Sequence, residues 1–166
     1  MNIRPAAPNE AEQLTAIAVE SEAYWGGSTS FLVRFEELYK VTASFIEHNP
    51  TFVLEEGGEI AGFYAIVKGN DASELEYLYV KASCIGKGYG RMLWEHLMEQ
   101  CKELGIQQLE LVTSPEAKDF YARMGATQVS TVESTIEEGR MIPRMVYMAK
   151  GPISRNEIKG KTSYTK

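Results

Sequence analysis

The chain has 166 residues, 44% of them hydrophobic and 24% charged, which suits one folded domain with its own core. The formal net charge of −6 argues against a nucleic-acid-binding protein, because such proteins need an excess of Lys and Arg to neutralise phosphates. No stretch approaches the roughly 18 apolar residues of a membrane span, and the first residues lack the layout of a signal peptide. We therefore expect a cytoplasmic protein with neither nucleic acid nor a membrane among its partners.

The few cysteines and histidines lack the spacing of a disulfide framework or a metal centre, so no metal is expected. Cys101 falls at an apolar helical position and is expected in the core. Cys84 precedes a glycine-rich segment, but a role as an acyl carrier is the weaker interpretation, because no histidine lies near it in the sequence. His48 and His96 are expected on helix surfaces.

The N-terminal part is predicted to be helical after a short strand at 2–4. Apolar residues recur at helical spacing over 9–23, and 31–39 follows as a second helical segment. Ser44, with Glu47 three residues later, resembles a capping box, which predicts a third short helix over 42–48.

A hairpin is predicted next, because the β-rich runs 51–56 and 59–68 flank Gly57 and Gly58, which suit a tight turn. The run 74–80 is predicted as a further strand. Regular alternation divides its side chains into two sets, with Leu75, Tyr77 and Tyr79 on one face and Glu74, Glu76, Leu78 and Val80 on the other.

The clearest helix covers 88–104, with an apolar stripe and Gly105 placed to end it. A strand is predicted at 107–113, and Ser114 and Pro115 mark the start of a helix that runs to residue 124. Strands at 127–132 and 141–149 complete the domain. The run 141–148 is apolar enough to pair at a sheet edge with a second subunit, which suggests a homodimer.

This order predicts a mixed α/β domain over 1–149, followed by a mobile basic tail at 150–166. The strand at 74–80, the helix at 88–104 and the strand at 107–113 form one parallel, right-handed crossover. No internal repeat and no second domain is expected.

The strongest functional signal is the passage from the strand at 74–80 through a short glycine turn into the helix. Residues 85–90 read IGKGYG, so glycines alternate at the mouth of the helix. Glycine lets the backbone N–H groups approach a ligand, and the helix N-terminus adds partial positive charge at the same point. Lys87 and Arg91 add two cations. The pattern predicts an anion site; a plain glycine turn is the weaker interpretation.

Two other phosphate-binding patterns do not fit this loop. A P-loop requires Ser or Thr directly after its Gly-Lys pair, where this chain has Gly88. The dinucleotide fingerprint requires a glycine where this chain has Arg91.

The loop resembles motif A of the GNAT N-acetyltransferases, and a second stretch, AKDFYARMGA at 117–126, resembles another signature of that family. The resemblance implies a GNAT acyl-CoA N-acyltransferase fold, with a mostly antiparallel sheet, a splayed parallel strand pair and flanking helices. It also implies acetyl-CoA as the acyl donor. Two positions depart from the family pattern: Ile85 replaces the usual Gln or Arg, and Ser114 replaces the Asn of many members.

The resemblance also implies which residues bind the donor. Pantetheine would pair with the backbone of the strand before the loop, and the pyrophosphate would bind the amides of the loop itself. The expected cofactor-binding residues are Leu78, Tyr79, Val80, Gly86, Lys87, Gly88, Tyr89, Gly90, Arg91, Ser114 and Tyr121.

For catalysis, Tyr121 matches the family's general acid, and Glu76 is the preferred general base, with Glu74 or a water chain as alternatives. The acceptor is expected to be a small-molecule amine. Its pocket would be walled by Tyr24 and Trp25, with Tyr64 as a weaker candidate.

Three other functions remain open from the sequence. The domain could bind acyl-CoA as a sensor without catalysis, since fold does not fix function. It could acetylate a protein lysine or N-terminus, which needs an open peptide groove. It could bind the phosphates of another nucleotide, although no acidic motif is placed to hold magnesium.

Overall fold

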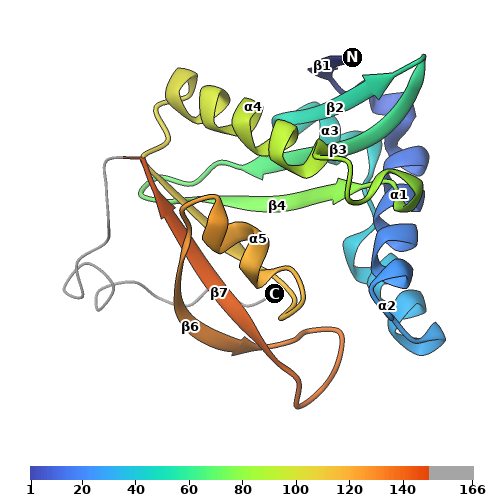
Figure 1. Cartoon of the computed structure of the whole chain (residues 1–166), viewed down its shortest axis with the longest axis vertical. Coiled ribbons are helices and arrows are strands. Elements are labelled where there is room, and N and C mark those ends of the chain that lie inside the picture. The colour runs from blue at the N-terminus through green and yellow to red at the C-terminus, as the bar shows by residue number, and fades with distance from the viewer. Residues whose placement is uncertain (150–166) are drawn as a thin grey trace.

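In the computed structural model, which describes residues 1–149, a seven-stranded sheet runs through the molecule and carries helices on both faces (Figure 1). The strand order is β1-β2-β3-β4-β5-β7-β6. This mixed α/β architecture confirms the predicted fold class. No helix in this part of the chain is long and apolar enough to cross a membrane. The predicted tail at 150–166 lies outside the described residues.

The N-terminal half supplies an edge strand, three helices and the predicted hairpin. In chain order its elements are β1 (Asn2–Pro5), a 3-10 turn (Pro8–Glu10), α1 (Ala11–Tyr24), α2 (Thr29–Tyr39), α3 (Ala43–His48), β2 (Thr51–Glu56) and β3 (Glu59–Val67). Gly57 and Gly58 turn the hairpin with φ of 60° and 80°, a backbone conformation that favours glycine.

The C-terminal half contains the crossover and the closing strands. Its elements are β4 (Ser73–Val80), a 3-10 turn (Ala82–Cys84), α4 (Tyr89–Glu103), β5 (Gln108–Val112), α5 (Lys118–Arg123), β6 (Thr127–Glu133) and β7 (Met141–Met148). Every other pair of neighbouring strands is antiparallel, whereas β4 and β5 run parallel. The predicted crossover is confirmed.

The parallel pair separates after a short contact. Ser73 is in register with Leu109 and Glu74 with Glu110, and no later pair of β4 and β5 is in register within the described chain. Beyond that point the two strands diverge, so the sheet opens at the carboxyl end of β4, where the glycine loop begins. This is the splayed pair that the resemblance implies.

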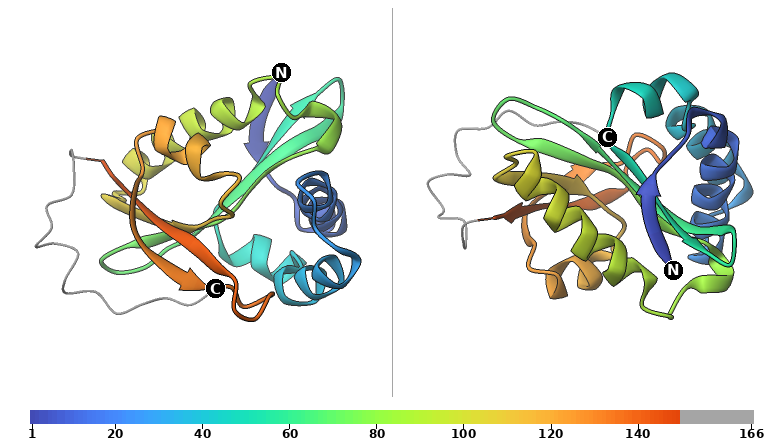
Figure 2. Two further views of the ribbon diagram at one scale, coloured as in Figure 1. Left: turned by 60° about the horizontal axis from the view of Figure 1, so that its bottom comes forward. Right: turned by 90° about the horizontal axis from the view of Figure 1, so that it is seen from above.

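Helices lie against both faces of the sheet (Figure 2), and a hydrophobic cluster forms on each face. One packs α4 and α5 against the sheet through residues such as Leu93, Leu97 and Tyr121. The other packs α1, α2 and α3 against the opposite face, with Leu14 and Phe35 among its members. The predicted burial of Cys101 is confirmed in the first cluster.

The regular alternation predicted for β4 is wrong. Leu75, Leu78 and Val80 pack toward α4, whereas Tyr77 and Tyr79 belong to the cluster under α1 and α2. The cause is a β-bulge: Ile66 is in register with Leu75 but Ala65 with Tyr77, so Glu76 is an extra residue that reverses the facing of the rest of the strand.

Three smaller expectations also need correction. Thr42, not Ser44, caps α3, because its extended backbone lets its hydroxyl accept a hydrogen bond from the N–H of Phe45 at 3.0 Å. The helix after β5 begins only at Lys118, since residues 115–117 form a turn. Strand β7 lies between β5 and β6 and is therefore not an edge. The homodimer loses this basis but stays a prediction.

Candidate active site

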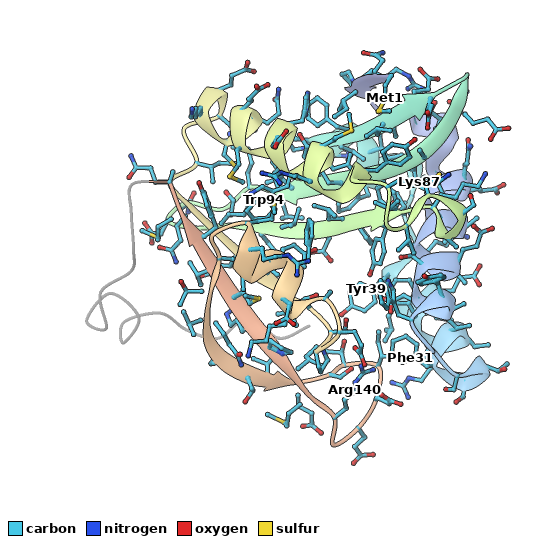
Figure 3. The ribbon with its side chains drawn as sticks, viewed as in Figure 1. Met1, Phe31, Tyr39, Lys87, Trp94 and Arg140 are labelled. Carbon is cyan, nitrogen blue, oxygen red and sulfur yellow. The ribbon has the colours of Figure 1, made fainter. Side chains whose placement is uncertain are left out.

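The glycine loop has the geometry of an anion site at the start of α4. Gly86 and Gly88 have φ of 83° and 85°, which a residue with a side chain rarely adopts, and Gly88 is the N-cap of the helix. Among residues 1–149 no side chain caps the first N–H groups of α4. The exposed Lys87 sits between the two glycines (Figure 3). These features leave backbone donors and a cation where a pyrophosphate could bind.

The side chain of Tyr89 anchors the glycine loop to β2. This residue is buried, and its hydroxyl donates a hydrogen bond to the Glu56 carboxylate on β2. That hydrogen bond and burial raise the pKa of Tyr89 to about 12. Gly90 allows α5 to pack closely, because a Cβ there would lie 3.4 Å from the Phe120 ring. Tyr89 and Gly90 can therefore serve a ligand through their backbone.

A cavity of about 180 Å³, here called the inner cavity, lies where β4 and β5 diverge. Its walls come from residues 75–79 of β4, the end of β5, the N-terminal side of α5, helices α1 and α2, and the loop between β6 and β7. Segments from both halves of the chain thus enclose one space.

Tyr121 reaches the inner cavity from α5. It is buried, and its ring packs against Trp94 with 5.9 Å between ring centroids. Burial raises the pKa of its hydroxyl. The phenol therefore keeps its proton at neutral pH and is able to donate it to a developing anion in the cavity.

Tyr79 and Glu22 form a hydrogen-bonded pair in the same cavity. The Tyr79 hydroxyl donates to Glu22 Oε1 at 2.8 Å. Burial raises the pKa of both groups. At Glu22 the hydrogen bond from Tyr79 acts in the opposite direction and lowers the pKa. Glu22 is a site residue that the sequence does not predict. Its one visible signal is a position two residues before Tyr24 of the aromatic pair Tyr24-Trp25, since nothing local shows that α1 faces β4.

The two predicted carboxylate bases occupy different places. Glu76, at the bulge of β4, lines the inner cavity. It also lines a separate cavity of about 600 Å³ on the side of α2 and the β3–β4 turn, and Glu74 lines that separate cavity without reaching the inner one. The geometry therefore favours Glu76 over Glu74.

A second space of about 270 Å³, here called the outer cavity, adjoins the inner one. It is lined by residues of the α1–α2 loop, by Glu116 and by the β6–β7 loop. Arg140 of that loop lies 3.6 Å from Glu116 and 3.1 Å from Glu137, and its guanidinium is 5.8 Å from the centroid of the Phe31 ring (Figure 3). Arg140 thus ties the loop to the other walls.

The two neighbouring aromatic residues predicted to wall the acceptor pocket, Tyr24 and Trp25, have different surroundings in the structure. Trp25 lines both the inner and the outer cavity. Tyr24 packs edge-on against Trp25, with 5.1 Å between ring centroids, but is exposed and lines neither cavity.

The placement of Tyr64 in the acceptor pocket is wrong. Tyr64 is fully buried between β3 and α4, and its hydroxyl is hydrogen-bonded to His96 Nδ1 at 2.8 Å. The same contact corrects the expectation for His96, which is half-buried against Phe52 and Tyr64 instead of lying on the helix surface.

The remaining predicted residues surround the glycine loop and the splay. Leu78 and Tyr79 line the inner cavity, and Ser114 lines both cavities while its Oγ accepts a hydrogen bond from the Ala117 N–H at 3.3 Å. Val80 packs toward α4, and Arg91 pairs with Glu95 at 3.2 Å on the exposed side of that helix. The backbone of Val80 lies at the end of β4, and the backbone of Arg91 lies in the first turn of α4, directly after the glycine loop.

Comparison with known proteins agrees with this geometry. The sequence model of the Acetyltransferase (GNAT) family matches residues 14–126, which span the glycine loop, the splay and Tyr121. The chain therefore belongs to the GNAT family of acetyltransferases. This confirms the predicted family and the predicted class of enzyme, an N-acetyltransferase.

One curated relative is a 5-NmdU N-acetyltransferase of Pseudomonas phage PaMx11, 29% identical over 127 residues that cover 75% of this chain and 86% of the relative. Among solved structures, the PaiA N-acetyltransferase of Thermoplasma acidophilum, in complex with coenzyme A, has a TM-score of 0.73 at 19% identity, covering 89% of this chain and 98% of its own. The ribosomal-protein-S18-alanine N-acetyltransferase of Escherichia coli has a TM-score of 0.66 at 16% identity, with coverage of 93% and 97%. At these identities the structures show a shared fold.

Proposed function

We propose that this chain transfers the acetyl group of acetyl-CoA to a primary amine of a small molecule, in a single complex of protein, donor and acceptor. The observation that carries the proposal is the inner cavity, which opens where β4 and β5 diverge and brings a buried tyrosine and carboxylates to one point. The glycine loop lies at the end of the same strand. One ligand could therefore reach from the loop into the cavity.

The donor would be held mainly by backbone groups. Beyond Glu74, β4 has no described register with β5, so the backbone of Leu78, Tyr79 and Val80 on that side can pair with pantetheine. The amides of residues 86–91 would bind the pyrophosphate, with Lys87 adding charge. Since Ile85 supplies no polar side chain, the loop depends on its amides.

The chemistry requires alignment, a proton acceptor and a proton donor. A neutral amine attacks the thioester carbonyl, and alignment of the two reactants contributes about 7–11 kcal/mol in favourable cases. Tyr121 would protonate the departing thiolate. Within residues 1–149 two carboxylates line the inner cavity, Glu22 and Glu76, and Glu76 is the base that the sequence predicts.

The acceptor side favours a small molecule over a peptide. The inner and outer cavities measure about 180 and 270 Å³ and are closed on one side by the β6–β7 loop, which Arg140 holds in place. A cytoplasmic enzyme without nucleic-acid or membrane partners, acting as a monomer or a homodimer, remains the prediction from the sequence.

Calorimetric titration with acetyl-CoA, CoA and ATP, followed by a thiol-release assay, tests the proposal. We expect both CoA species to bind and ATP not to bind. The assay should use aliphatic primary amines, 5-NmdU as the acceptor in the relative's name, and a lysine peptide. Thiol release with a small amine supports the proposal. Binding without release from any amine would indicate a sensor, release with the peptide alone a protein acetyltransferase, and no binding of CoA a different ligand.

A further inference from the structure

Glu22 occupies the junction of the two cavities that lead to the splay. It lines the outer cavity together with Arg140 and Glu116, and it lines the inner cavity together with Tyr121. Because Glu22 lines both cavities, an acceptor in the outer cavity whose amine points toward the splay lies beside the Glu22 carboxylate.

The charges around Glu22 favour a positively charged ligand in the outer cavity. The outer cavity carries the carboxylates of Glu22, Glu116 and Glu137 against the single guanidinium of Arg140 among its described lining residues. The groups that act on Glu22 are Tyr79, which donates a hydrogen bond, the cation of Arg140 and the anion of Glu116; Tyr121 lies across the inner cavity. An excess of negative charge in a partly closed space attracts an ammonium group.

We propose that Glu22 binds the ammonium group of the acceptor at this junction and removes its proton, which makes the acceptor a cationic primary amine. This assignment rests on the proposed acetyl transfer. It gives Glu22 a catalytic role, and it gives Tyr79 the role of a positioning residue that holds the carboxylate toward the cavity through its 2.8 Å hydrogen bond.

In the proposed reaction the acceptor nitrogen loses two protons, and the first goes to Glu22. The ammonium passes one proton to the Glu22 carboxylate, and the neutral amine attacks the thioester carbon, so that a C–N bond forms and the C–S bond breaks. Tyr121 delivers its proton to the thiolate, and the second proton of the nitrogen, released as the amide forms, returns to the Tyr121 oxygen. The products are the acetylated amine and CoA thiol, and Glu22 returns its proton to solvent. Burial raises the pKa of Glu22, which makes its carboxylate a stronger base than an exposed glutamate.

The alternative base, Glu76, has a different setting. It connects the inner cavity with the separate cavity beside α2, where Tyr39 and Thr135 also lie, and it is absent from the lining of the outer cavity. The Tyr39 hydroxyl and Thr135 Oγ1 are 2.8 Å apart, and both residues line the inner cavity and the separate cavity. An acceptor arriving through the outer cavity therefore meets Glu22 first.

Three glutamine variants of similar shape separate these roles. We expect Glu22→Gln to lower kcat/KM for the best amine by about 100-fold or more, the usual range for a general base, while the affinity for acetyl-CoA stays the same. Glu20→Gln, on the exposed face of the same helix, is the matched control and should retain wild-type kinetics. Glu76→Gln should lose less activity than Glu22→Gln. Wild-type turnover in Glu22→Gln, or a large loss confined to Glu76→Gln, would overturn the assignment.

The pH dependence adds a readout that a purely structural role would not change. The acidic limb of kcat/KM should reflect Glu22, because its carboxylate must be unprotonated to act. Tyr79→Phe removes a hydrogen bond that lowers the pKa of Glu22, so the limb should move to higher pH. An unmoved limb in Tyr79→Phe contradicts the assignment.

A carboxyl-carbon NMR titration of Glu22, assigned with Glu22→Gln, needs no acceptor. It therefore judges Glu22 even if the wild-type protein acetylates no amine and the proposed function fails. A pKa above the ordinary glutamate range that rises further in Tyr79→Phe supports the assignment. An ordinary pKa that is insensitive to Tyr79 would overturn it.

Discussion

The proposed donor end and the proposed acceptor end of the active site are built in opposite ways. The donor end is one continuous segment, β4 followed by the glycine loop and α4, and it offers mainly backbone groups. The acceptor end joins α1, α2, the β5–α5 turn and the β6–β7 loop through side chains. Tyr39 and Thr135, which close one wall, are 96 residues apart in sequence. Backbone geometry fixes the donor site, whereas the acceptor site depends on side chains that meet only after folding.

This contrast predicts its largest effect in the glycine loop. Gly88→Glu forces a side chain onto a backbone with φ of 85° and places negative charge where the pyrophosphate would bind. The strain costs about 1–3 kcal/mol of stability. The side chain and its charge in the loop should lower the affinity for acetyl-CoA about 100-fold or more. Calorimetric titration measures the change.

Gly105→Glu is the matched control, since Gly105 has φ of 69° and equally open surroundings at the other end of α4. It should strain the fold but retain acetyl-CoA affinity. Equal loss of affinity in the two variants would mean that general instability, and not the loop, explains the result.

The second-largest effect is expected on kcat, from the proposed proton donor Tyr121, which lies between the donor end and the acceptor end. Tyr121→Phe should lower kcat about 100-fold by removing the proton donor, with acetyl-CoA affinity unchanged. Tyr147→Phe is a suitable control because Tyr147 packs against the same Trp94, with 5.5 Å between ring centroids. Steady-state thiol release provides the comparison. If Tyr121→Phe turns over like the wild-type protein, the thiolate does not need this hydroxyl.

A smaller effect is expected at the acceptor wall. Trp25→Ala removes an aromatic surface that lines both cavities, so KM for the amine should rise about 10-fold, equivalent to about 1.4 kcal/mol, with little change for acetyl-CoA. Tyr24→Ala should raise KM less, because Tyr24 lines neither cavity. Amine titration at saturating acetyl-CoA measures both KM values. A larger rise in KM for Tyr24→Ala than for Trp25→Ala would place the acceptor on the outer surface of this loop.

The smallest effect is expected in the β5–α5 turn. Ser114→Ala removes the hydrogen bond from the Ala117 N–H to Ser114 Oγ, so the free energy of unfolding should fall by about 0.5–1.5 kcal/mol. Activity should fall only a few-fold, as the turn would move slightly. Ser130→Ala, at an exposed position of β6, is the control for chemical denaturation. A complete loss of activity with unchanged stability would instead give Ser114 a direct role at the donor.

The same contrast explains what the sequence could predict. Periodicity and glycine placement are local signals, so the hairpin, α4 and the crossover could be predicted correctly. The bulge at Glu76 depends on register with β3, and regular alternation could not reveal it. Tyr64 was misplaced because an aromatic strand residue looks the same whether it faces a pocket or α4.

Glu22 is a site residue that local sequence patterns could not predict. Its importance comes from Tyr79, 57 residues later in the chain, and from Arg140, which reaches the outer cavity from the β6–β7 loop. Neither contact leaves a spacing pattern within α1. Tyr121 could be predicted because it lies within a contiguous family signature, whereas the acceptor wall has no such signature.

Mass spectrometry of the amine after incubation with acetyl-CoA and the wild-type protein shows directly whether this chain transfers an acetyl group. We expect a gain of one acetyl group on a cationic primary amine, with an equal amount of CoA thiol released and much less of both products from Gly88→Glu at limiting acetyl-CoA. Acetyl-CoA that binds tightly but leaves every amine unmodified would contradict the claim that this cavity performs acetyl transfer.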